Sequence, residues 1–425
     1  MNSNSIKYRI LILLLLYMPF HFYISEIFLS FTQVDNLMRD IVIIVLFLVA
    51  LIKGFKVTKV GALILFNCAV LVIFAALSIL STRNLSILNV LRTYLVPTLI
   101  YFVVTNITLT KKQIEFIHKL VVVELAIIAI YGFFQAFFLG DDFIIALGYP
   151  SQGGFLKGSS YYIGGFHGMQ RAVGTFVSPN TCGLIIAVAL CVVMFSQKNV
   201  FGKSKIIWIG MLIIGLLGTL SRSAILGVVI AIVFVYIFSN RMYVVNKKML
   251  YIVAIIGCLG ITGVLAVDAF LLNGLFVTML TSSIGGLLTG SDISASAHFS
   301  DLFTPIAVLI ENPWGLGFGN NGPMAVEYMQ DPNLIESSIY LMIYEIGVFF
   351  GLLYFLPYII PIVQTLLDNS YRYKIPAAVC VTVLLTYVFL PHVQTYEAIF
   401  YSFLFVGMYY NSSVIEYYKG AKENG

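Results

Sequence analysis

The sequence predicts an all-α, polytopic helical membrane protein with about twelve transmembrane helices. Of its 425 residues, 60% are hydrophobic and only 10% are charged, and the mean hydropathy is +0.98. A soluble domain of this length would carry roughly 25% charged residues. Apolar runs of about 20 residues recur from end to end, which is the length that crosses a bilayer. We therefore expect one integral membrane domain over residues 1–425.

The expected spans follow one another with short polar turns between them. The first apolar run follows Lys7 and Arg9 and lacks a small-residue cleavage site, so we expect a retained helix rather than a signal peptide. Allowing about four residues at each boundary, the spans are expected at 8–30, 36–53, 60–80, 87–107, 114–138, 180–196, 205–220, 222–239, 249–268, 337–364, 375–392 and 396–412.

Positive charge is unevenly distributed over the turns of this topology. Eighteen of the 24 Lys and Arg residues fall on one side, which the positive-inside rule makes the cytoplasm, with both termini inside. This asymmetry explains the net charge of +5 without nucleic-acid binding, so no nucleic-acid partner is expected. The six exceptions lie on or near the outer side, where an anionic ligand is the simplest reason for them: Arg39, Arg83, Arg92, Lys157, Arg171 and Arg222.

Two long connections are expected outside the membrane. The first covers 140–179, and the second is a large loop over 269–335, between the ninth and tenth helices. Long loops in a compact protein are usually functional or disordered, and the aromatic and apolar residues in both favour ordered structure. The large loop is expected to contain short amphipathic helices, one of them at 299–310, lying in the membrane interface.

The stretch RAVGTFVSPNTCGLI, residues 171–185, places a cation beside a helix start. Arg171 precedes Gly174 and a Ser-Pro-Asn turn that ends in Asn180, after which an apolar helix begins. A guanidinium group and a helix N-terminus both suit an anion such as phosphate. The alternative for Arg171 is an interface anchor whose charge reaches the headgroups.

Two further arginines stand at or within apolar spans. Arg222, in GTLSRSAILG, follows a tight turn at the outer face, and its alternative role is a turn anchor. Arg92, in LNVLRTYLVP, lies inside a span and is expected to face a cavity or to pair with Asp40 or Glu124. Pro97 predicts a kink in the same span.

The large loop offers the candidate bases. Glu336 at the start of the tenth span, or His298 in SASAHFSDL, could accept a proton from a sugar hydroxyl, although a carboxylate at a helix start also complements the helix dipole. Glu345 is expected to face inward or to pair. The run GLGFGNNG, which includes Gly317, could form a nest of N–H groups around an anion or simply reverse the chain. The five cysteines lie in apolar runs without metal-binding spacing, so no metal site is expected.

Four of these motifs in this order resemble the O-antigen polymerase and O-antigen ligase superfamily: RAVGTFVSPN, GTLSRSAILG, ENPWGLGFG and ESSIYLMIYEIGVFFGLLYF. The similarity covers about residues 85–365, and LNVLRTYLVPTLIYF resembles the arginine-bearing span that precedes them in the family. It implies a GT-C-type glycosyltransferase that moves undecaprenyl-diphosphate-linked oligosaccharide at the outer face of the bacterial cytoplasmic membrane, without metal or nucleotide cofactor. By analogy, Arg171 and Arg222 would hold the diphosphate, and Arg92, Asn180 and Gly317 are the further residues expected to bind it.

The resemblance implies a polymerase of O-antigen or capsular repeat units, with membrane lipid and a chain-length regulator protein as further partners. The ligases carry a histidine near the start of the span after the large loop, where this chain has Glu336, which favours a polymerase. An arginine that the large loop often carries is replaced by His298. The alternatives are an O-antigen ligase-type transferase and a flippase or transporter of lipid-linked oligosaccharide. The transporter predicts charges along a central path and internal symmetry.

Overall fold

The computed structural model describes residues 3–24, 32–51, 55–149, 151–152, 155–156, 161–163, 169–239, 310–330, 332, 334–367 and 374–423. The described chain is almost entirely helical, which confirms the all-α class. The exceptions are two antiparallel hairpins of two-residue strands, Ser151–Gln152 with Phe155–Leu156 (β1–β2) and Tyr162–Ile163 with Met169–Gln170 (β3–β4). The expected ninth span, His298 and the 299–309 part of the predicted amphipathic helix lie outside the described residues.

The helices follow the predicted order of apolar segments. In the first half they are α1 Ser3–Tyr17, α2 Thr32–Leu51, α3 Lys59–Thr82, α4 Ile87–Leu95, α5 Leu99–Thr105, α6 Lys111–Phe134 and α7 Gly140–Ala146. In the second half they are α8 Pro179–Phe195, α9 Lys198–Phe201, α10 Lys205–Thr219, α11 Arg222–Ser239, α15 Ser338–Tyr354, α16 Leu356–Leu367, α17 Lys374–Phe389, α18 Tyr396–Tyr410 and α19 Ser412–Glu423.

Among the residues that the structure describes, five helical segments are long and apolar enough to cross a membrane: Lys59–Thr82, Ile87–Thr105, Lys111–Ala146, Gly202–Thr219 and Ser338–Leu367. Shorter apolar helices cover Pro179–Phe195, Arg222–Phe238 and Lys374–Phe389. These segments support a helical membrane protein. The full set of twelve spans stays a prediction.

Two expected spans are broken helices. The span expected at 87–107 divides into α4 and α5 around Pro97, as the proline predicted, because proline has no N–H to donate and its ring obstructs the preceding turn. The Thr98 hydroxyl donates to the Leu95 carbonyl at 2.6 Å at this break. The span expected at 337–364 divides into α15 and α16, and α15 itself is interrupted at Gly347, where φ is +83°.

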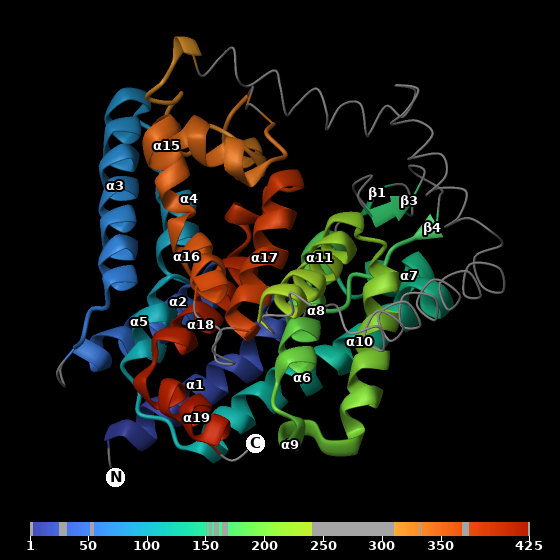
Figure 1. Cartoon of the computed structure of the whole chain (residues 1–425). Coiled ribbons are helices and arrows are strands. Elements are labelled where there is room, and N and C mark those ends of the chain that lie inside the picture. Colours follow the sequence, from blue (N-terminus) through green and yellow to red (C-terminus); the bar gives the residue numbers. More distant parts are fainter. Residues whose placement is uncertain are drawn as a thin grey trace.

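Helix α8 forms the centre of the bundle. Nearly all of its side chains are buried, and it packs against α6, α10, α11, α17 and α18 (Figure 1). A helix that is apolar on every side needs apolar partners all round, which is why five helices surround it. Helices α3, α4, α15 and α16 form the part of the bundle to the left of this group in the same view.

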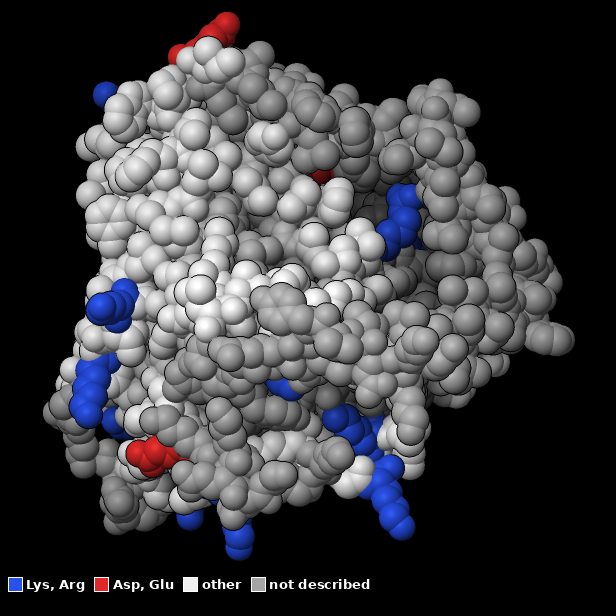
Figure 2. Space-filling view, viewed as in Figure 1, with Lys and Arg blue, Asp and Glu red and all other residues white. Residues whose placement is uncertain are grey.

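Among the described residues, the first and last helices and the basic residues near them lie at one end of the molecule, here called the basic end. The Asn4 side chain donates to the Thr108 carbonyl at 2.6 Å, the Lys56 amide donates to Asn106 at 2.8 Å, and the Lys111 ammonium lies 5.9 Å from the Tyr417 ring centroid. Figure 1 places both termini at the lower edge, and Lys and Arg side chains gather along that edge in Figure 2. This charge distribution is the one that the positive-inside prediction requires.

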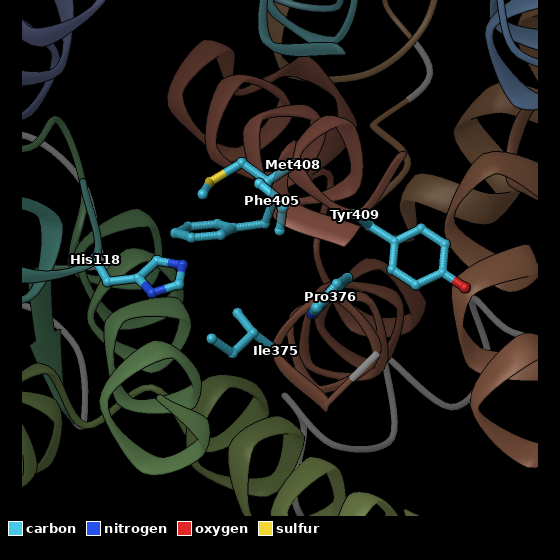
Figure 3. A pocket seen from close by; sticks show the side chains of 7 residues that line it. His118, Ile375, Pro376, Phe405, Met408 and Tyr409 are labelled. Carbon is cyan, nitrogen blue, oxygen red and sulfur yellow. The ribbon is translucent and has the colours of Figure 1, made fainter. Parts of the chain in front are cut away.

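A small apolar pocket lies between α6, α17, α18 and α19 (Figure 3). The ring of His118 faces Phe405 across it, with Ile375 and Pro376 on the α17 side. The pocket contains no residue of the candidate site, and the turns that carry Arg222, Glu336 and Gly317 belong to the opposite end of the helices.

Candidate functional site

The Arg171 side chain is held by two neutral oxygen atoms. Its Nε donates to the Thr219 carbonyl at 2.8 Å, and its Nη2 donates to Asn180 Oδ1 at 2.7 Å. Thr219 is the last residue of α10, where carbonyl groups lack donors within the helix and favour a nearby cation. Asn180 is the second residue of α8, so the guanidinium joins the end of one helix to the start of another.

Arg222 is the second cation at this corner. It is the first residue of α11 and is exposed, and it follows a turn in which Leu220 adopts the left-handed conformation at φ +51°. Burial, and then repulsion from nearby Arg222, lower the pKa of Arg171 to about 10. The structure therefore brings Arg171, Arg222 and Asn180 together, although the two arginines are far apart in sequence.

The loop that carries Arg171 is fixed by Gly174. This glycine has φ +58°, and a Cβ there would come within 2.8 Å of Ile128 Cγ2. Its carbonyl accepts hydrogen bonds from the Tyr23 hydroxyl and the Gln135 amide, both at 3.0 Å. The Thr175 hydroxyl donates to the Pro19 carbonyl at 2.5 Å. These contacts dock the loop on α6 and on the chain that follows α1, so the position of Arg171 is set by packing.

The start of α8 lies against the turn that carries Arg222. Ser178 caps the helix, since its Oγ accepts from the Thr181 amide at 3.1 Å, and Pro179 occupies the first turn. A Cβ on Gly183 would meet Ser221 Cβ at 2.7 Å and Thr219 Oγ1 at 2.9 Å. This close approach places the helix N-terminus beside both arginines, and all three features favour an anion.

Arg92 belongs to a different cluster. Its Nε lies 3.4 Å from Asp40 Oδ2, so the predicted alternative of a pair with Asp40 is found. Arg39 shares that carboxylate, with its Nε 3.5 Å from Oδ1, and the Tyr396 hydroxyl donates to Oδ1 at 2.9 Å. Neither Tyr396 nor the Arg39–Asp40 pair was expected from the sequence to belong to this cluster. The adjacent charges of Arg39 and Asp40, just before an apolar run, were the available signal.

Glu336 is exposed, two residues before α15. The next two residues tie this point to the turn between α17 and α18: the Ser338 hydroxyl donates to the Leu390 carbonyl at 2.5 Å and accepts from the Val393 amide at 3.0 Å. Glu336 therefore stands beside that turn. Its role as a base stays a prediction.

The glycine run around Gly317 closes on a carboxylate of the protein itself. Glu345 Oε2 accepts from the Gly319 amide at 2.7 Å, and the Asn321 amide is a second partner of the same carboxylate. Glu345 was expected to face inward or to pair, but its partner could not be identified from the sequence. Gly317 has φ +109°, and its carbonyl accepts from Asn321 Nδ2 at 3.0 Å. The binding of an external anion at Gly317 stays a prediction.

The glycine-rich loop around Gly317 supplies hydrogen-bond partners for the backbone groups at the break in α15. At Gly347 the helix loses the bond between the Val348 amide and the Tyr344 carbonyl. The Val348 amide instead donates to the Pro313 carbonyl at 3.0 Å, and the Tyr344 carbonyl accepts from the Leu316 amide at 2.7 Å. A side chain at Gly347 would have no room, because its Cβ would lie 2.7 Å from the Pro313 carbonyl oxygen.

Within the described ranges, no group of three or more His, Cys, Asp or Glu side chains is placed to hold a metal ion. The polar groups brought together at the Arg171 corner are two guanidinium groups, an amide side chain and a helix N-terminus. No protein-family model matches this chain, and no curated protein is similar to it at a significant level.

Proposed function

We propose that this protein is a polymerase of undecaprenyl-diphosphate-linked oligosaccharide repeat units, of the O-antigen or capsular kind, acting at the outer face of the bacterial cytoplasmic membrane. The observation that carries the proposal is the meeting of Arg171 and Arg222. Two like charges repel each other, so their approach costs free energy unless an anion lies between or beside them. A diphosphate group, with its several anionic oxygens, matches two guanidinium forks.

The reaction would be a glycosyl transfer between two lipid-linked molecules. A hydroxyl oxygen of the acceptor sugar attacks the anomeric carbon of the donor glycan, and the bond from that carbon to the diphosphate oxygen breaks. The diphosphate leaves with the bonding electron pair while still attached to its lipid. Arg171 and Arg222 would stabilise the charge that develops on it, and Asn180 holds Arg171 in place. Glu336 is the candidate that accepts the hydroxyl proton.

The transporter alternative has one observation in its favour. Several ionisable residues are buried inside the bundle, among them Asp40, Glu124 and Glu345. Ionisable residues within a membrane bundle often line a substrate or proton path. A flippase would move the same lipid-linked sugar without forming a glycosidic bond, so the chemistry of the product separates the two functions.

The test uses the full-length protein in liposomes with a defined lipid-linked repeat unit. Longer lipid-linked chains are the expected product. Arg171→Gln and Arg222→Gln should each lower the rate by roughly 10²–10³-fold, as the loss of one transition-state donor does. Arg83→Gln removes an exposed arginine at the end of α3 and should have no effect.

Three outcomes would contradict the proposal. Normal rates in both arginine variants would remove the diphosphate assignment. Transfer of glycan only to an acceptor other than a repeat unit would indicate a ligase. Movement of the lipid-linked sugar across the bilayer, with no new bond formed, would indicate a transporter.

A further inference from the structure

We propose that Arg92 forms a second site for a lipid-borne phosphate or diphosphate group, separate from Arg171 and Arg222. The site is built from α2, α4 and the start of α18, and it is organised around the carboxylate of Asp40. Its existence is independent of the proposed reaction, and only the identification of its ligand as the second lipid-linked substrate rests on that reaction.

Asp40 is shared by two arginines. Its side chain is only 4% exposed and lies 3.5 Å from Arg39 Nε and 3.4 Å from Arg92 Nε. One carboxylate carries one negative charge, so it neutralises only one of the two guanidinium groups. Glu397, the other acidic residue of this region, makes no ion pair with either arginine among the described residues, and its electrostatic partner is Arg39. Arg92 therefore has no carboxylate of its own and shares that of Asp40 with Arg39.

The Arg39 guanidinium is not accessible to a ligand. The residue is 5% exposed, its Nη1 lies 3.2 Å from His21 Nδ1, and its guanidinium carbon lies 3.4 Å from the centroid of the Tyr396 ring. With Asp40 on a further side, this guanidinium is enclosed by protein. It acts as a fixed internal cation.

Arg92 is arranged differently. Its side chain is 31% exposed, and it meets Asp40 through Nε alone. Within the described part of the chain, that contact is its only ion pair. An arginine held by Nε still presents Nη1 and Nη2, which can donate to two phosphate oxygens at once. Arg92 lies in the last turn of α4, within an apolar span, so the ligand should be one that is delivered by lipid.

The cluster sits just inside the turn that leads into α18. Tyr396, whose hydroxyl binds Asp40, is the first residue of α18 and follows the turn His392–Gln394. The same turn receives Ser338 at the start of α15. In the expected topology, the headgroup of a lipid in the outer leaflet would meet the bundle at this level. Both an undecaprenyl diphosphate carrier and an anionic phospholipid carry the required phosphate chemistry.

The test measures binding to purified full-length protein in neutral detergent by native mass spectrometry, with undecaprenyl diphosphate and phosphatidylglycerol as separate probes. The wild-type protein should bind two diphosphate lipids. Arg92→Gln should retain one and weaken the other by roughly tenfold or more, since a charge-assisted bond is removed. The double variant Arg171→Gln, Arg222→Gln should also retain one, and Arg83→Gln, the matched control, should retain both.

The direction in which Asp40→Asn changes lipid binding distinguishes an anion site from a structural ion pair. If Arg92 is only half of a structural ion pair, the substitution weakens the cluster and lowers any lipid binding with it. If Arg92 is an anion site, removing the competing carboxylate should strengthen binding of the diphosphate probe by several-fold. Unchanged stoichiometry in Arg92→Gln, or weaker binding in Asp40→Asn, would overturn the proposal.

The two probes then identify the source of the phosphate. If Arg92→Gln loses one bound undecaprenyl diphosphate but no bound phosphatidylglycerol, the result supports a second lipid-linked substrate. The reverse result supports an annular phospholipid, and it would leave the assignment of Arg171 and Arg222 unaffected. A third outcome is also possible. If the Arg171 and Arg222 variants lose the state with two bound lipids but Arg92→Gln binds as the wild type does, the proposed function stands and the second site is contradicted.

Discussion

Two glycine-containing turns at the end opposite the basic end differ in the charge they enclose. The turn over residues 171–178 contains Gly174 at φ +58°, and the turn over residues 312–322 contains four glycines with positive φ. Both are docked against broken or irregular helix ends. In the first, Arg171 donates to neutral acceptors of α10 and α8, whereas the second is closed by the carboxylate of Glu345.

The comparison shows that a glycine-rich turn is not an anion site by its backbone alone. Backbone N–H groups that point to one place attract negative charge, but the protein can supply that charge itself. Glu345 does so for Gly319. At residues 171–178 the corresponding position carries cations, so an external anion would complete it. The following predictions test this difference, beginning with the largest effect.

Neutralising one charge at each turn should distinguish the catalytic role of Arg171 from the structural role of Glu345. Arg171→Gln should lower the transfer rate by roughly 10²–10³-fold at unchanged protein level, because it removes a donor to the leaving diphosphate. Glu345→Gln keeps an oxygen that can accept from Gly319 and should leave the rate per folded molecule within about threefold of the wild type, about 0.7 kcal/mol. Both rates are measured on reconstituted protein with a lipid-linked repeat unit. An equal loss of transfer rate in the two variants would contradict the difference between the two turns.

A methyl group added at Gly174 should destabilise the protein strongly. Positive φ costs roughly 1–2 kcal/mol for a residue with a Cβ, and overpacking against Ile128 adds about 1–3 kcal/mol. Gly202→Ala is the matched control, because Gly202 has φ +55° but nothing lies within 4 Å of its added Cβ. Thermal unfolding in detergent should place the midpoint of Gly174→Ala well below that of Gly202→Ala. Equal midpoints would mean that the loop is not packed tightly on α6.

The sequence was a good guide where one residue sets local structure. Pro97 predicted the break between α4 and α5, the basic turns predicted which end carries the termini, and Ser178-Pro179 predicted the start of α8. Each of these signals acts within a few residues, through a missing donor, a turn or a net charge. Such local signals do not depend on tertiary packing, which is why the all-α class and the order of segments could be predicted.

Partners across the bundle could not be predicted in the same way. The sequence put Arg92, Arg171 and Arg222 in one class, and only the packing of α2 and α18 assigns Arg92 to Asp40 and separates it from the other two. Glu345 was expected to face inward or to pair, but its partner lies 26 residues earlier, in a loop that fills the break at Gly347. Such contacts depend on how helices pack, and the hydrophobic periodicity of the sequence does not predict them.

Removing the Glu345 carboxylate altogether should loosen the second turn and leave the first intact. Glu345→Ala leaves the buried Gly319 amide without its acceptor, which should cost about 1–3 kcal/mol. Hydrogen exchange of peptides covering residues 312–322 should speed up, while peptides covering 171–178 stay protected. Glu345→Gln should show an intermediate change. Faster exchange in both turns at once would indicate that they unfold as one unit.

Acid should act on the second turn through His392, which lies in the turn that anchors it. Gln394 of this turn donates to the Asn321 carbonyl at 3.1 Å and accepts from the Met324 amide at 3.1 Å. Burial lowers the pKa of His392 to about 4, so the unfolded chain binds a proton more readily than the folded protein below pH 6.5.

Stability from this group should therefore be complete above pH 6.5 and fall as the pH drops from 6.5 toward 4. Between pH 7 and pH 5.5 the loss should be on the order of 1 kcal/mol. Comparing wild-type protein with His392→Gln over this range isolates the effect, because the glutamine does not titrate. We expect a shallower decline in the variant. In the wild type, the protection factor of residues 312–322, which corrects for the slower intrinsic hydrogen exchange in acid, should fall before that of residues 171–178. Parallel pH curves for the two proteins would show that His392 does not supply this acid sensitivity.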